Sequence, residues 1–146
     1  MMESYPNVLD QSLVGTYPAT AFAGGGYVWD EVLEYRVWCC PKNGADDLAE
    51  GSDYFYPFPT FGEANAFARI TRGADVPLAL VLQREYIDEP APGDFRHMKQ
   101  SRVTEWPVEF LVRPRRTSRT LLDFFAADAP ANRLEIIRGS CADHGT

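Results

Sequence analysis

The arginines of this acidic chain gather in one short segment. The protein has 146 residues and a formal net charge of −7, yet Arg113, Arg115, Arg116 and Arg119 stand close together. Guanidinium groups bind phosphate or carboxylate through paired hydrogen bonds. The segment also precedes a predicted helix, and helix N-termini favour anions. The sequence therefore predicts an anion-binding site, for a small-molecule anion or a protein partner. The alternative is a basic surface that pairs with the protein's own acids.

Acidic side chains surround a proline-rich turn later in the chain. They are Glu85, Asp88, Glu89 and Asp94. Carboxylates are suitable ligands for hard cations, but this spacing fits no EF-hand loop. The only histidines are His97 and His144, which is too few for a typical zinc site. We therefore expect a solvated turn and no metal site.

Three consecutive glycines, Gly24, Gly25 and Gly26, precede the first predicted strand. Such a run can bring backbone amides close to an anion. It does not match the GxGxxG pattern of dinucleotide-binding loops, and no helix is evident after it. We interpret it as a flexible or tightly turned entry to the strand.

The net charge also limits the classes of partner. Binding to nucleic acid or to an anionic membrane surface needs an excess of lysine and arginine, so we expect neither. Residues Met1 to Asp10 lack the basic and apolar regions of a signal peptide. The adjacent Cys39 and Cys40 suit neither a disulfide framework nor a CxxC pair. We therefore expect a cytoplasmic protein with reduced thiols.

The elements that must position these residues follow from the hydrophobic pattern. Strands are predicted over Val32–Cys40 and Tyr54–Phe58, and the unbroken apolar run within Leu78–Ile87 indicates a central strand covered on both faces. Phe95–Met98 is expected to return as a hairpin partner. Val103–Val112 looks extended, with Pro107 placing it at an edge, at a bulge or at an interruption.

Two helices are predicted between and after these strands. Thr60 and Glu63 form a capping box, in which each side chain would bind the backbone N–H of the other residue. Gly73 is placed to end that helix. Thr117 or Ser118 is expected to cap a short second helix whose Leu121, Leu122 and Phe125 share one face.

These elements predict an α+β fold with a mostly antiparallel sheet of about five strands and two or three helices. We expect an irregular N-terminal arm over residues 1–18, a single domain over 19–139 and a flexible tail over 140–146. The length suits one domain.

Most of the chain resembles a small family of bacterial proteins. The matching segments are ATAFAGGGYVWDEVLEYRVW, PLALVLQREYIDEP and TEWPVEFL, together with the Phe58-Pro59-Thr60 and Glu63-Ala64 pattern. Members are commonly catalogued as GCN5-related acetyltransferases. The resemblance implies a shared fold and an N-acetyltransferase that uses acetyl-CoA. The Q/R-x-x-G-x-G/A loop that holds the cofactor pyrophosphate in GCN5-related enzymes does not occur here, since the chain after the best strand reads QREYIDEPAPG.

The order of three other residues resembles a second family. Arg36, Thr60 and Glu105 follow the arginine, serine or threonine, and glutamate order of ADP-ribosyltransferases. In that family the arginine holds an NAD phosphate and the glutamate stabilises an oxocarbenium-like transition state. The alternative for these weak catalytic candidates is strand-face salt bridges plus a helix cap.

Three functions therefore stay open. The first is a ligand- or partner-binding module. The second is an acetyl-CoA-dependent N-acetyltransferase, as the family resemblance implies. The third is an NAD-consuming enzyme of the ADP-ribosyltransferase type, which would need Arg36 and Glu105 at one cleft.

Overall fold

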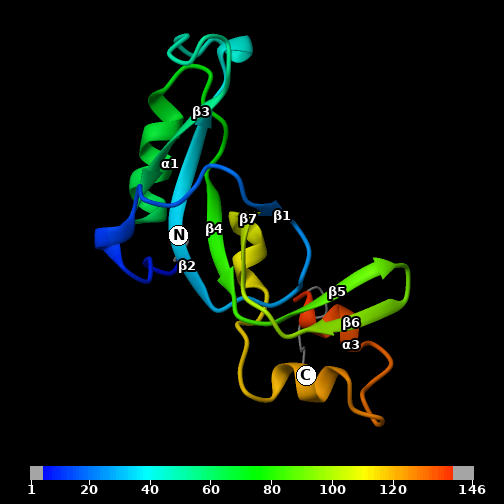
Figure 1. Cartoon of the computed structure of the whole chain (residues 1–146). Coiled ribbons are helices and arrows are strands. Elements are labelled where there is room, and N and C mark those ends of the chain that lie inside the picture. The colour runs from blue at the N-terminus through cyan, green and yellow to red at the C-terminus, as the bar shows by residue number, and fades with distance from the viewer. Residues whose placement is uncertain (1–4, 140–146) are drawn as a thin grey trace.

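The computed structural model describes residues 5–139, and the tail predicted over 140–146 lies outside the described residues. Within that part of the chain the fold is α+β, with seven strands and three α-helices (Figure 1). The strands are β1 (Phe22–Ala23), β2 (Glu31–Cys39), β3 (Tyr54–Phe58), β4 (Leu78–Gln83), β5 (Tyr86–Ala91), β6 (Asp94–Met98) and β7 (Arg102–Pro107). The helices are α1 (Phe61–Ile70), α2 (Thr120–Phe124) and α3 (Arg133–Ile137).

Five strands form the main sheet, in the order β1-β7-β4-β2-β3. The predicted mostly antiparallel sheet of about five strands is confirmed, although it is not purely antiparallel because β1 pairs with β7 in parallel. A separate hairpin of β5 and β6 extends from one end of this sheet (Figure 1). This arrangement brings the start of β7 close to the root of the hairpin.

The predicted central strand lies at the centre of the sheet, but it is shorter than expected. β4 pairs with β2 on one side and with β7 on the other, and Ala79, Leu80 and Val81 are fully buried. The expectation of one strand over Leu78–Ile87 was wrong in extent. The chain bends at Arg84–Glu85 and continues as β5 in the hairpin sheet, because the apolar run ends at Leu82.

Helix α1 begins where the capping box predicted. The Thr60 hydroxyl accepts a hydrogen bond from the Glu63 backbone N–H at 3.1 Å. The reverse half of the box differs from the prediction, since the Glu63 carboxylate accepts from the Thr60 hydroxyl at 3.0 Å instead of from its backbone N–H. The helix ends at Ile70, before Gly73.

The main core lies between the sheet and α1. Ala64 of α1 packs with Tyr35 and Val37 of β2 and with Ala79 and Val81 of β4. Because side chains alternate along a strand, Glu34 and Arg36 point to the opposite face. On that face the segment before β1 covers Arg36, and its carbonyl groups at Pro18 and Ala19 accept hydrogen bonds from Arg36.

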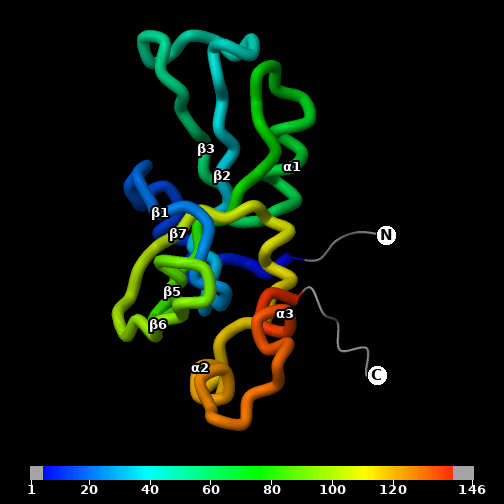
Figure 2. The backbone as a smooth tube through the Cα atoms, turned by 90° about the vertical axis from the view of Figure 1, so that its right-hand side faces the viewer, coloured from blue at the N-terminus to red at the C-terminus, as the bar shows by residue number. Residues whose placement is uncertain are grey.

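The chain after β7 contributes Leu121, Phe124 and Ile137 to a second core, which also contains Tyr27, Val28 and Ile87. The strand stops at Pro107, so of the three alternatives an interruption is observed; the expected extended segment to Val112 was wrong, because a 3₁₀ turn follows over Val108–Val112. Helices α2 and α3 lie at the end of the molecule opposite the β2–β3 connection (Figures 1 and 2). In α2 the buried pair is Leu121 and Phe124.

Two details of α2 differ from the prediction. Leu122 and Phe125 are exposed. The core-facing positions of α2 are Leu121 and Phe124, three residues apart, and Phe125 already lies beyond the last helical residue. The helix begins after Arg119 with no side-chain cap, and the Thr117 hydroxyl instead accepts a hydrogen bond from the Arg119 backbone N–H at 3.2 Å.

The two edges of the main sheet are short or interrupted. β1 covers only two positions of β7, opposite Thr104 and Glu105. At the other edge β3 contains Pro57, which lies opposite Arg36 of β2.

Candidate functional site

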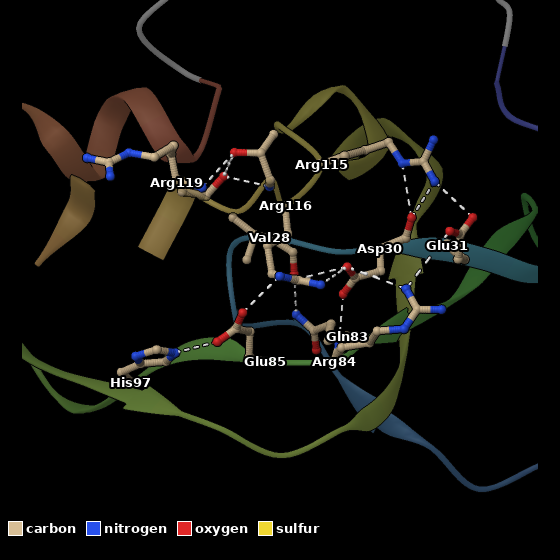
Figure 3. A network of polar contacts seen from close by, with 12 residues as sticks. Val28, Asp30, Glu31, Gln83, Arg84, Glu85, His97, Arg115, Arg116 and Arg119 are labelled. Atoms are coloured by element: carbon tan, nitrogen blue, oxygen red, sulfur yellow. Dashed lines mark hydrogen bonds and ion pairs between the residues drawn. The ribbon is translucent and has the colours of Figure 1, made fainter. Parts of the chain in front are cut away.

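Three of the four clustered arginines contact acidic residues of the same chain, and Figure 3 shows these contacts for Arg115 and Arg116. Arg116 binds Asp30 at 2.8 Å and Glu85 at 2.8 Å. Arg115 binds Glu31 at 2.8 Å and also donates to the Asp30 backbone carbonyl. Arg119 pairs with Asp123 at 2.8 Å on the exposed face of α2. These contacts match the alternative reading of the cluster, and its predicted anion site stays a prediction.

A continuous chain of polar contacts runs through Arg116. Its guanidinium joins the buried Asp30 to Glu85, and the other Glu85 oxygen contacts His97 Nε2 at 2.7 Å (Figure 3). The hydrogen bond that Arg116 donates to the Asp30 carboxylate raises the pKa of Arg116 despite partial burial. These polar contacts connect the turn after β4 and the β5–β6 hairpin to the segment before α2. Their evident role is to hold these parts of the fold together.

The fourth member of the cluster has a different environment. The Arg113 guanidinium lies 3.9 Å from the Phe110 ring centre and 5.4 Å from that of Trp106. No ion pair joins it to any residue from 5 to 139. Burial lowers its pKa, and the positive charge of Arg138 lowers it further.

The weak catalytic candidates are brought together only in part. Arg36 and Glu105 form an ion pair of 3.3 Å, and the Trp38 indole N–H donates to the same Glu105 oxygen at 2.8 Å. The Arg36 side chain is 0% exposed, however, and Glu34 binds it at 2.7 Å. Thr60 serves as the cap of α1. The described contacts therefore occupy Arg36 on every side and give it no open cleft.

The acidic turn shows no metal-binding geometry. Within residues 5–139 no group of three or more histidine, cysteine, aspartate or glutamate side chains is placed to hold a metal ion. Glu89 instead accepts hydrogen bonds from the Tyr27 hydroxyl at 2.6 Å and the Gly93 backbone N–H at 2.9 Å.

The glycine run forms a turn with unusual backbone geometry. Gly24, Gly25 and Gly26 have φ angles of 63°, 72° and 83°, and Tyr27 continues the series at 63°. Residues other than glycine rarely adopt such angles, so the backbone at Tyr27 is strained. The glycine run is therefore a tight turn, as expected, and it lies between β1 and β2. A Cβ added at Gly26 would lie 2.3 Å from Gln83 Nε2 and 2.8 Å from Arg102 Nη2, so only glycine lets these side chains approach.

Arg102, at the start of β7, lies directly against this turn. Its guanidinium is 3.8 Å from the Tyr86 ring centre and 5.3 Å from that of Phe22. Its Nε donates to Gln83 Oε1 at 2.9 Å. Gln83 is itself fixed, since its Nε2 donates to the Val28 carbonyl at 2.7 Å. The guanidinium is therefore held by two rings and one buried amide.

This well-held arginine has no counter-charge among the described residues. None of the ion pairs within residues 5–139 includes Arg102, and the only hydrogen bond of its side chain there is the one to Gln83. Its terminal nitrogens Nη1 and Nη2 thus keep their donors available. Sequence reasoning missed Arg102 because its partners Phe22, Gln83 and Tyr86 come from three other strands. The run of glycines marked its own turn in the sequence but did not indicate Arg102.

A shallow hollow adjoins the same corner of the sheet. It has a volume of about 290 Å³ and is lined by Thr20, Ala21, Phe22 and Val103. Phe22 belongs both to this lining and to the pair of rings around Arg102.

Comparison with known proteins adds no family assignment. No family model matches the chain, and neither the curated proteins nor the solved structures searched give a significant match. Among the helices of residues 5–139, none has the length and apolar character needed to cross a bilayer.

Proposed function

We propose that this protein is a binding module whose ligand carries a phosphate or carboxylate group, held by Arg102 beside the glycine turn. The observation that carries the proposal is the state of Arg102. Gln83 and two aromatic rings fix its guanidinium, while no described carboxylate neutralises it. A guanidinium that is already oriented loses little side-chain entropy on binding, which favours paired hydrogen bonds to an oxyanion.

The glycine turn supports the same proposal. Gly24 and Gly25 lack side chains that would shield their backbone N–H groups. Successive backbone amides in a turn can form concave sites for anions. Phosphate groups satisfy several such donors at once, because each oxygen accepts more than one hydrogen bond.

The guanidinium groups of Arg115, Arg116 and Arg119 are less available to an external anion than that of Arg102. Arg115, Arg116 and Arg119 already have acidic partners. An external anion there would have to compete with carboxylates of the same chain, which are present at a high effective concentration. The acetyl-CoA and NAD hypotheses stay predictions, and both cofactors belong in the same ligand panel.

Isothermal titration with inorganic phosphate tests the proposal directly. We expect saturable binding to the full chain and its loss in Arg102→Gln. The matched control is Arg69→Gln, which makes the same charge change on the exposed face of α1. Thermal shift gives a second readout, since a ligand at 100 times its Kd stabilises the folded state by about 2.7 kcal/mol. Equal loss of binding in both variants would point to nonspecific charge attraction and refute the proposal.

A further inference from the structure

Phe22 is exposed in a position that the fold does not explain. It belongs to the two-residue strand β1, and its side chain is 60% exposed. The Arg102 guanidinium lies over one face of the Phe22 ring, 5.3 Å from the ring centre. The strand pairing opposite Thr104 holds the Phe22 backbone at the edge of the sheet. A large aromatic side chain is thus fixed in place while much of its surface faces solvent.

The hollow beside Phe22 matches a flat, uncharged group. Its lining residues Thr20, Ala21, Phe22 and Val103 carry no charge and offer one hydroxyl group. The volume of about 290 Å³ is just below the range of about 300–1,000 Å³ for small-molecule sites. Every nucleobase has a flat face that stacks on exposed aromatic side chains. The exposed ring of Phe22 and the guanidinium of Arg102 lie side by side at one corner of the fold.

Accepting the proposed anion site as a premise, we propose that the ligand is a mononucleotide, with its base stacked on Phe22 and its phosphate held by Arg102. The two groups of such a ligand are joined by a ribose, which is long enough to pass the edge of one aromatic ring. The pairing of Arg102 and Phe22 across 5.3 Å supplies both contacts from neighbouring strands. A free anion would use Arg102 alone and leave Phe22 unexplained.

Isothermal titration of the full chain with four probes tests this proposal: AMP, ribose 5-phosphate, adenosine and inorganic phosphate. Since base stacking on an aromatic ring strengthens binding by about tenfold or more, we expect AMP to bind about tenfold tighter than ribose 5-phosphate. In Phe22→Ala the affinities for AMP and ribose 5-phosphate should become equal, and both ligands should keep only the phosphate affinity that remains once one of the two rings around Arg102 is lost. Leu122→Ala is the control, because Leu122 is 59% exposed on α2, outside this site.

The outcomes separate this inference from the proposed function. If phosphate binds through Arg102 but AMP and ribose 5-phosphate bind equally, the nucleotide inference is wrong and the anion site stands. If AMP binds and Arg102→Gln leaves its affinity unchanged, both proposals are wrong. Arg102→Lys keeps the charge without the planar fork, and we expect it to bind phosphate more weakly than the native protein. Thermal melting of each variant confirms that it is folded.

Discussion

The buried ion pair of Glu34 and Arg36 allows a direct test of how burial sets the strength of a charge interaction. Both side chains are 0% exposed and their closest atoms are 2.7 Å apart. Glu34→Gln keeps the shape but removes the negative charge. Arg36 would then have only Glu105, at 3.3 Å, as a carboxylate partner. Removing one partner of a buried pair costs about 3–5 kcal/mol, because the other charge stays desolvated without full compensation.

That cost is a large fraction of the stability of a typical domain, which is about 5–15 kcal/mol. Urea unfolding measures it. With a slope of about 2 kcal/mol per M, the midpoint of Glu34→Gln should fall by about 2 M. The Gly15 backbone N–H, which donates to Glu34 at 2.8 Å, should also exchange faster with solvent.

The matched control is the exposed pair of Arg119 and Asp123. Its separation of 2.8 Å is nearly the same, but the two side chains are 71% and 62% exposed. Arg119→Gln should therefore cost only about 0.3–0.5 kcal/mol. Similar midpoint shifts in Glu34→Gln and Arg119→Gln would refute the reasoning, since distance alone would then set the energy.

Three further changes have expected outcomes. Thr60→Ala removes the cap of α1 and should cost about 1 kcal/mol, measured from the urea midpoint; an unchanged midpoint would mean that the cap contributes nothing. The hydrogen bond from Tyr27 lowers the pKa of Glu89 below 4.5, so its stabilisation is present above that pH and lost as pH falls through the lowered value. Melting temperatures of Tyr27→Phe and the native protein should therefore differ more at pH 7 than in acid, where the hydrogen bond from Arg138 to the Tyr27 hydroxyl still separates them, whereas a gap independent of pH would contradict this. Gly73→Ala should lower the melting temperature more than Gly51→Ala does. Both glycines have φ near 80°, but only at Gly73 would the added Cβ clash, 2.2 Å from the Ala45 backbone nitrogen. Equal losses in the two variants would show that φ strain alone matters.

Features encoded over a few residues were predictable from the sequence. The capping residue Thr60 and the strand Tyr54–Phe58 depend on near neighbours, and the structure has both. The face of α2 was misread because a five-residue helix offers too few positions to define a period, so Leu122 looked like a core residue.

The candidate site was largely hidden because its contacts are distant in sequence. Arg116 binds Asp30, 86 positions away, and nothing near either residue indicates that pairing. Charge contrast alone therefore made the arginine cluster look free. Arg102 gave no local signal at all, since Gln83, which orients it, is 19 positions earlier. The sequence shows which charged residues are present and where they cluster. Only the tertiary fold shows which of them have a partner of opposite charge.

The two edges of the main sheet affect how copies of this protein meet one another at high concentration. An open edge strand can template the addition of a strand from another molecule. In β3, Pro57 has no backbone N–H to offer such a strand. At the opposite side, the pairing of β1 occupies the middle of β7, and Pro107 closes its end. Neither edge presents a long uninterrupted row of donors and acceptors, so this geometry opposes ordered growth into fibrils.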